Sequence, residues 1–314
     1  MAPTFKGSPD VNHELTQDIT AMPGRSDLIR LAIGTLGIGS SGPLIAMSTM
    51  PILTLVFLRN LAGSLLTLPF ALRNKFDRTG AKWAAAAGVL LALHFMGFFA
   101  AMRMTSVAAG TALVALQPIF ASIFVKVTGG HIPPKAWLGM AVSFAGVLLI
   151  SGIDFSIDRR SFIGDLAALI SAALAALYMM CGSRAMKTLE TSTYTSICYG
   201  VCALTALPVA IVSGSELIHF PAREWWILLG LLVGAQFLGH SMFNSVLKRV
   251  SPAVVSLIVF FEVPIAAILA GIFNIGQQPS GFIIPGMILI LAGCTMVVLR
   301  TRPAREMVRA EVLE

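Results

Sequence analysis

Residues 236–269 read QFLGHSMFNSVLKRVSPAVVSLIVFFEVPIAAIL, and most of this stretch is an apolar run that holds a single carboxylate. The part over residues 250–273 is long enough to cross a lipid bilayer as a helix, at about 1.5 Å per residue. Glu262 lies roughly 16 Å into that span. A carboxylate at this depth costs roughly 2.5–3.5 kcal/mol on membrane-insertion scales. We therefore expect Glu262 to face a polar cavity that the rest of the chain encloses.

The composition of the 314-residue chain is that of a helical membrane protein. Hydrophobic residues make up 56% of it and charged residues only 12%, whereas soluble domains carry about 25% charged residues. Apolar runs of nearly the length that a spanning helix needs follow one another with short loops between them. They lie at about 28–47, 52–72, 83–102, 106–126, 136–153, 163–183, 191–213, 225–246, 251–273 and 281–299. The sequence therefore predicts an all-α integral membrane protein with ten transmembrane helices.

The Lys and Arg residues are divided unequally between the loops. If the N-terminus is cytosolic, 17 of the 22 fall in cytosolic segments, four fall in outer loops, and Arg59 lies inside a span. Because cytosolic loops of membrane proteins are enriched in Lys and Arg, we expect both termini in the cytosol. Residues 1–27 and 300–314 are the expected cytosolic tails, the second of them basic. Topology explains the net charge of +7, so we expect no nucleic-acid partner.

The two halves of the chain repeat each other. Matching residues are separated by an offset that rises from 138 to 147 and never falls, as a duplication with a few small insertions would produce. Each half holds five predicted spans, an odd number, so the halves must lie in opposite orientations. We expect inverted repeats over residues 28–153 and 163–299. The matching pairs include Asp27 with Asp165, His94 with Gln236, Ser106 with Ser251, Gln117 with Glu262, Gly139 with Gly286, and Gly146 with Gly293.

Three stretches carry a resemblance to a known family. They are FLRNLAGSLLTLPFAL (57–72), AMRMTSVAAGTALVALQPIFASIF (101–124) and SPAVVSLIVFFEVPIAAILAG (251–271). They resemble the EamA-type repeat of the drug/metabolite transporter superfamily. The resemblance covers about residues 28–299 and implies a ten-helix carrier with a central cavity, located in the cell membrane and most simply in a bacterial inner membrane. The family pattern usually places Glu directly before Pro in the ninth span, whereas Val263 intervenes here, so the local bend is expected to differ.

Polar residues inside the spans are the candidates for a site. Glu262 and its repeat mate Gln117 lie at similar depths, so a pseudo-two-fold axis would place them across a central cavity. Glu262 could contact a substrate amine or carry a coupling proton, or it could make a structural hydrogen bond near the bend at Pro264. Arg59 could bind a carboxylate or phosphate through its planar fork of donors, or extend its charge to the outer interface.

The eighth span carries a polar stripe. Gln236, His240 and Asn244 are four residues apart, so an α-helix presents them on one face. They either line the cavity or make hydrogen bonds between helices. His94 is the repeat mate of Gln236 and is expected to face inward. The complete predicted set of substrate-binding or coupling residues is Glu262, Gln117, His94, Gln236, His240, Asn244 and Arg59.

Enzyme signatures are missing from the sequence. It contains no HExxH, no GxSxG, no glycine-rich phosphate loop and no Cys/His metal spacing. We expect no catalytic residues, metal or cofactor, but a secondary transporter that exports amino-acid-like or amphipathic solutes by alternating access. Its partners are the lipid bilayer and a small-molecule substrate, with protons as a candidate coupling ion. The alternatives are uptake of a metabolite such as riboflavin or S-adenosylmethionine, an intramembrane enzyme acting on lipid, and a structural subunit. The pattern leaves the oligomeric state open.

Overall fold

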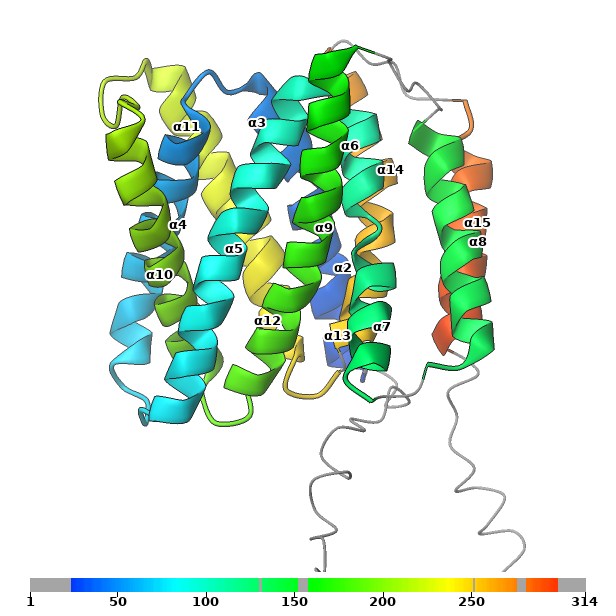
Figure 1. The fold of residues 1–314 in the computed structure, drawn as a ribbon, viewed down its shortest axis with the longest axis horizontal. Coiled ribbons are helices and arrows are strands. Elements are labelled where there is room, and N and C mark those ends of the chain that lie inside the picture. The colour runs from blue at the N-terminus through cyan, green and yellow to red at the C-terminus, as the bar shows by residue number, and fades with distance from the viewer. Residues whose placement is uncertain (1–23, 130–131, 152–157, 251, 276–280, 299–314) are drawn as a thin grey trace, which may run out of the picture.

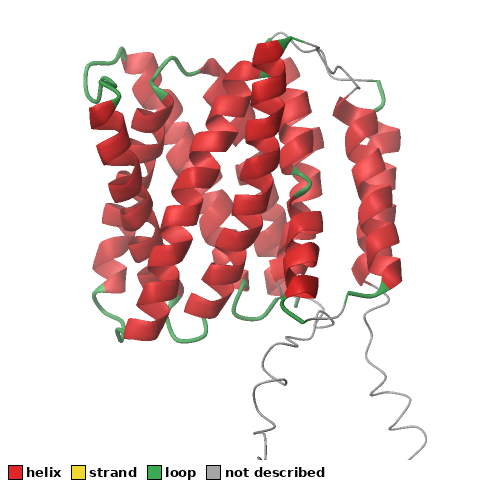
Figure 2. Cartoon of the chain, viewed as in Figure 1, coloured by secondary structure: helices red, strands yellow, loops and turns green. Residues whose placement is uncertain are grey.

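The structure, a computed structural model, describes residues 24–129, 132–151, 158–250, 252–275 and 281–298 (Figures 1 and 2). All regular secondary structure in these residues is helical, which confirms the all-α part of the predicted fold class. The predicted tails lie outside the described residues, apart from residues 24–27. Within the described residues, eight helical segments are long and apolar enough to cross a membrane, and the apolar helices Pro134–Ile150 and Ile283–Val297 are shorter.

The helices follow one another along the chain with short links. The first half forms α2 (Arg25–Gly39), α3 (Ser41–Met47), α4 (Ile52–Ala71), α5 (Arg78–Met104), α6 (Val107–Val114), α7 (Gln117–Val127) and α8 (Pro134–Ser151). The second half forms α9 (Arg159–Ala185), α10 (Thr191–Val212), α11 (Ala222–Gly230), the π-helix η1 (Leu231–Ser241), α12 (Met242–Val246), α13 (Pro252–Ile258), the 3₁₀ turn η2 (Val259–Phe261), α14 (Glu262–Ile272) and α15 (Ile283–Val298). Successive helical columns cross the bundle in alternating directions. The start of α2 and the end of α15 lie at the same end of the bundle (Figure 1).

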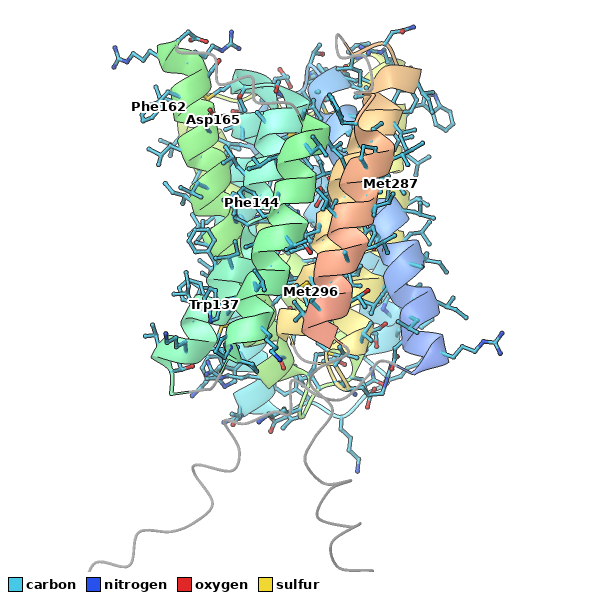
Figure 3. All side chains as sticks on the ribbon, turned by 90° about the vertical axis from the view of Figure 1, so that its right-hand side faces the viewer. Trp137, Phe144, Phe162, Asp165, Met287 and Met296 are labelled. Atoms are coloured by element: carbon cyan, nitrogen blue, oxygen red, sulfur yellow. The ribbon has the colours of Figure 1, made fainter. Side chains whose placement is uncertain are left out.

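Helices from the two halves pack against each other. α5 runs along α9, α4 along α10, α8 along α15, and α2 along η1. Small residues bring α8 and α15 close together: a Cβ on Gly139 would lie 2.6 Å from the carbonyl oxygen of Gly293, and a Cβ on Gly146 would lie 2.5 Å from that of Gly286. Figure 3 shows these two helices side by side on one face of the bundle. Small residues permit such close helix packing inside membranes.

Large apolar side chains cover the outside of the bundle. Phe162 projects outward from α9 (Figure 3), and the exposed surface also includes Leu36, Leu204 and Ile288. So many large exposed apolar side chains are unusual for a soluble monomer. The outer surface of the helices is therefore suited to contact with lipid.

Two helical columns are broken at equivalent places. A turn separates α6 from α7 directly before Gln117, and Figure 2 shows it as a loop inside the column. The 3₁₀ turn η2 separates α13 from α14 directly before Glu262. Pro118 and Pro264 lack the backbone N–H that would continue the preceding helix. Although Val263 separates Glu262 from Pro264, both Gln117 and Glu262 are the first residue of a half-helix.

Candidate functional site

A cavity lies where the two broken columns meet α5, α9 and η1. Its volume is about 30 Å³, which leaves room for one or two water molecules. A metabolite therefore requires the wall to rearrange before it can enter. The wall includes Glu262, Gln117, His94 and His240 from the predicted set, together with the rings of Phe95, Phe98 and Tyr178.

Glu262 is the acidic group of the cavity wall. Its side chain is 4% exposed, and it makes no hydrogen bond or ion pair with any residue in the described part of the chain. The predicted alternative, a structural hydrogen bond near Pro264, is therefore not found among those residues. A buried carboxylate without a partner is costly, so stability alone does not explain a carboxylate at this position.

Gln117 ties the fourth span to two others. Its Nε2 donates to the hydroxyl of Ser256 on α13 at 3.1 Å and lies 3.1 Å from the sulfur of Met179 on α9. Ser256 and Met179 were not among the predicted residues, because neither residue type stands out in an apolar run. Gln117 and Glu262 thus share a cavity, but only Gln117 is anchored to neighbouring helices.

Two histidines form part of the same wall. Nδ1 of His94 lies 2.7 Å from the hydroxyl of Ser171 on α9 and 3.0 Å from its carbonyl oxygen. The ring of His240 lies 6.5 Å from the His94 ring and 5.2 Å from the Phe95 ring, between centroids. Nδ1 of His240 has no partner among the described residues. His94 is therefore fixed in place, whereas His240 keeps one nitrogen for another contact.

Arg59 lies beside the cavity and not on its wall. Its side chain is fully buried, so the predicted extension to the outer interface is wrong. Nε donates to Oε1 of Gln236 at 2.8 Å. The guanidinium carbon lies 4.4 Å from the centre of the Phe95 ring and 6.0 Å from that of Phe99. Phe95 therefore contacts Arg59 and also lines the cavity.

The polar stripe of the eighth span points in three directions. Gln236 bonds to Arg59 on α4, His240 lines the cavity, and Asn244 accepts a hydrogen bond of 2.8 Å from the hydroxyl of Tyr178 on α9. Of the two predicted alternatives, hydrogen bonds between helices are found for Gln236 and Asn244, and a place on the cavity wall is found for His240. The prediction used the spacing of an α-helix, whereas Gln236 and His240 lie in a π-helix, whose wider turn changes the angle between successive residues.

A second buried carboxylate was not predicted. Glu224 in the first turn of α11 is 1% exposed and accepts hydrogen bonds from the hydroxyl of Ser48 at 2.6 Å and from the backbone N–H and hydroxyl of Thr49 at 3.1 and 3.0 Å. It holds the link between α3 and α4. Because its partners lie about 175 residues away along the chain, no local pattern could have identified it.

Comparison with known families decides the relationship of this chain. The model of the EamA-like transporter family matches residues 28–152 and, a second time, residues 162–299. The chain belongs to the EamA-like transporter family. It is therefore a multi-pass cell-membrane protein that transports solutes, and it is not an enzyme. This confirms the family that the three sequence stretches indicated.

Individual relatives agree with this assignment. An uncharacterized transporter of Archaeoglobus fulgidus is 24% identical, covering 76% of this chain and 85% of its own length. The pseudopaline exporter CntI of Pseudomonas aeruginosa is 22% identical, covering 79% and 87%. The inner membrane transporter YedA of Escherichia coli is 25% identical, covering 79% and 84%. A solved crystal structure has the same fold, with a TM-score of 0.71 at 18% identity over 88% of this chain and 98% of that chain.

Proposed function

We propose that this EamA-like transporter is a secondary carrier that exports amino-acid-like or amphipathic metabolites by alternating access. The proposal rests mainly on the environment of Glu262. This residue is buried, has no partner among the described residues and begins a half-helix at a cavity wall. Broken helices at the interface of two repeats form the substrate sites of many secondary transporters. The direction of transport follows the Pseudomonas aeruginosa relative, which is named an exporter.

We propose that the two matched regions are inverted repeats of five spans each, with both termini in the cytosol. The contact between α8 and α15 supports this arrangement. The repeat equates Gly139 with Gly286 and Gly146 with Gly293, so it converts the contact of Gly139 with Gly293 into that of Gly286 with Gly146. Both contacts are present, as a pseudo-two-fold axis requires. The excess of basic residues on one side supports the cytosolic termini.

The cavity residues have different roles in this proposal. Glu262 binds a cationic group of the substrate or a coupling proton, and Gln117, His94 and His240 contact the polar part of the solute. The small volume of the cavity means that its wall has to move before a solute can enter, as it would in a carrier that alternates between two open states.

The coupling role of Glu262 is tested by neutralising it. We expect Glu262→Gln to abolish transport driven by a proton gradient while exchange of substrate for substrate continues. Glu216→Gln is the matched control, because Glu216 is a carboxylate in an exposed loop and the variant should transport normally. The pH dependence of transport is the measurement: an unchanged pH profile in Glu262→Gln would contradict proton coupling through this residue.

A second candidate function is uptake of a metabolite with a flat ring. The rings of His94 and Phe98 are nearly parallel, with centroids 6.0 Å apart and planes 4° apart, and both line the cavity. Such rings favour stacking on a planar solute. Preferential transport of riboflavin over amino-acid-like solutes would support this candidate against the first.

A further inference from the structure

Arg59 carries a buried positive charge that no described residue compensates. It forms no ion pair in the described part of the chain. Its Nη1 and Nη2 are buried and have no hydrogen-bond partner among the residues that the structure describes. An unpaired buried charge costs free energy. These two nitrogens form the planar fork that matches a carboxylate.

A third donor lies beside this fork. Oε1 of Gln236 accepts the hydrogen bond from Nε of Arg59, while Nε2 of Gln236 is buried and has no partner in the described part of the chain. Gly63 on α4 makes room for that amide, since a Cβ at this position would collide with Nε2 of Gln236. Nη1, Nη2 and Nε2 together make a donor cluster on the side of Phe95 that faces Arg59.

Phe95 contacts Arg59 of this donor cluster and also lines the cavity. Its ring packs on the guanidinium at 4.4 Å, lines the cavity and contacts His240. Glu262 lies on the cavity wall and, within the described residues, forms no ion pair. A buried positive group therefore contacts Phe95, and a buried negative group lines the cavity that Phe95 also lines; within the described residues, neither group has an ion-pair partner.

We propose that Arg59 and Gln236 form an anion subsite and that the carried solute is a zwitterion. Its carboxylate binds the Arg59 fork, its cationic group binds Glu262, and Phe95 moves aside to join the two poles. The assignment rests on the proposed carrier function and names the substrate class. A zwitterion compensates both buried charges at once, whereas a purely anionic or purely cationic solute leaves one of them unpaired.

The test uses probes that differ by one charge. L-Leucine, L-methionine and L-phenylalanine are compared with their carboxamides, which lack the carboxylate, and with their N-acetyl derivatives, which lack the ammonium group. Binding to the purified full-length protein is measured by calorimetry. We expect at least one zwitterion to bind roughly tenfold to hundredfold more tightly than both of its derivatives, as expected for loss of a charge-assisted hydrogen bond.

Two variants distinguish the proposed carboxylate site at Arg59 from the proposed cation site at Glu262. Arg59→Gln should weaken binding of the zwitterion to the level of its carboxamide and leave carboxamide binding unchanged, which also shows that the variant is folded. Glu262→Gln should instead remove the discrimination against the N-acetyl derivative. Equal binding of a zwitterion and its derivatives, or no binding of any zwitterion, overturns the subsite. Counterflow of riboflavin and other solutes then judges the carrier function separately.

A different observation concerns the two ends of the bundle. At the end where α2 begins, Arg249 makes a two-pronged ion pair with Asp27: Nη2 lies 2.6 Å from Oδ1 and Nε lies 3.1 Å from Oδ2. The repeat mate of Asp27 is Asp165. Figure 3 shows Asp165 near the start of α9, at the end opposite to Trp137.

The corresponding pair at that opposite end is not formed. Arg103 lies three residues before Ser106, as Lys248 and Arg249 lie three and two residues before its repeat mate at position 251. Nε and Nη2 of Arg103 and Oδ1 of Asp165 are buried and find no partner within the described ranges. The two segments are nevertheless close, because a Cβ on Gly164 would lie 3.0 Å from the backbone nitrogen of Thr105.

We infer that these pairs are alternating latches: Asp27 with Arg249 closes one end of the bundle, and Arg103 with Asp165 closes the other end after the first pair has opened. The inference rests on alternating access. Carboxylate and guanidinium groups suit this role because the charge-assisted hydrogen bonds between them are strong when the pair is formed.

Accessibility of the cavity from each side tests the latches. Ser41→Cys on the cavity wall is labelled with a membrane-impermeant thiol reagent in oriented vesicles, after the four native cysteines are replaced by serine. Asp27→Asn should raise labelling from the Asp27 end and lower it from the other end, and Arg103→Gln should do the reverse. The exchange Asp27→Arg with Arg249→Asp should restore the original ratio. Changes in the same direction for both variants, or no change, overturn the inference.

Discussion

Replacement of Glu262 by glutamine tests whether this carboxylate stabilises or destabilises the folded protein. The side chain is 4% exposed and has no hydrogen-bond partner in the described residues, so Glu262→Gln removes no interaction. It does remove the burial of a group whose charged form costs roughly 2.5–3.5 kcal/mol inside a membrane. We therefore expect the variant to be at least as stable as the wild type, with a gain of up to about 2 kcal/mol.

The assay is thermal unfolding of the purified protein in detergent, followed by tryptophan fluorescence. Gln117→Ala is the comparison, because Gln117 donates to Ser256 and its loss should lower stability by about 1 kcal/mol. A Glu262→Gln variant that is less stable than the wild type by more than about 1 kcal/mol would refute the reasoning, since Glu262 would then have a structural partner.

Three further predictions concern the scaffold. Glu224→Ala leaves buried donors of the link between α3 and α4 without an acceptor and should lower the free energy of unfolding by about 2 kcal/mol, measured by thermal unfolding. Gly139→Ala should destabilise by about 1–3 kcal/mol because the new methyl group meets the backbone of α15, whereas Gly281→Ala, which meets nothing within 4 Å, should have little effect. Asp158→Ala should lower the unfolding temperature at pH 7, because the Ser161 hydroxyl and a backbone N–H hold the pKa of this helix-capping carboxyl below its usual value; the deficit should shrink as the pH falls below about 4.

The architecture could be predicted because its signals are local. Each spanning helix is an apolar run of its own, and the repeat shows in residues that keep nearly the same spacing. The pairing of Gln117 with Glu262 followed from that symmetry, and the structure places both at the start of half-helices on one cavity wall. A polar residue deep in a span carries information because lipid tolerates few of them.

The features that the sequence did not predict depend on contacts between segments that are distant along the chain. A Cβ on Gly37 of α2 would lie 2.5 Å from the carbonyl oxygen of Gly234, and this close approach accompanies the π-helix that reoriented Gln236 and Asn244. An α-helical register misses such a change. The burial of Arg59 behind Phe95 likewise depends on how α4 and α5 pack, which periodicity does not encode.

Counterflow in proteoliposomes tests most directly whether this protein is a carrier for amino-acid-like solutes. Vesicles are loaded in turn with amino acids, an opine-like metabolite, S-adenosylmethionine or riboflavin, and entry of the labelled solute is followed. We predict accelerated entry with at least one amino-acid-like solute, and retention of that acceleration in Glu262→Gln, because exchange does not need the coupling proton. Slow entry at the rate of empty vesicles for every solute, with protein shown to be folded and inserted, would contradict the proposed function.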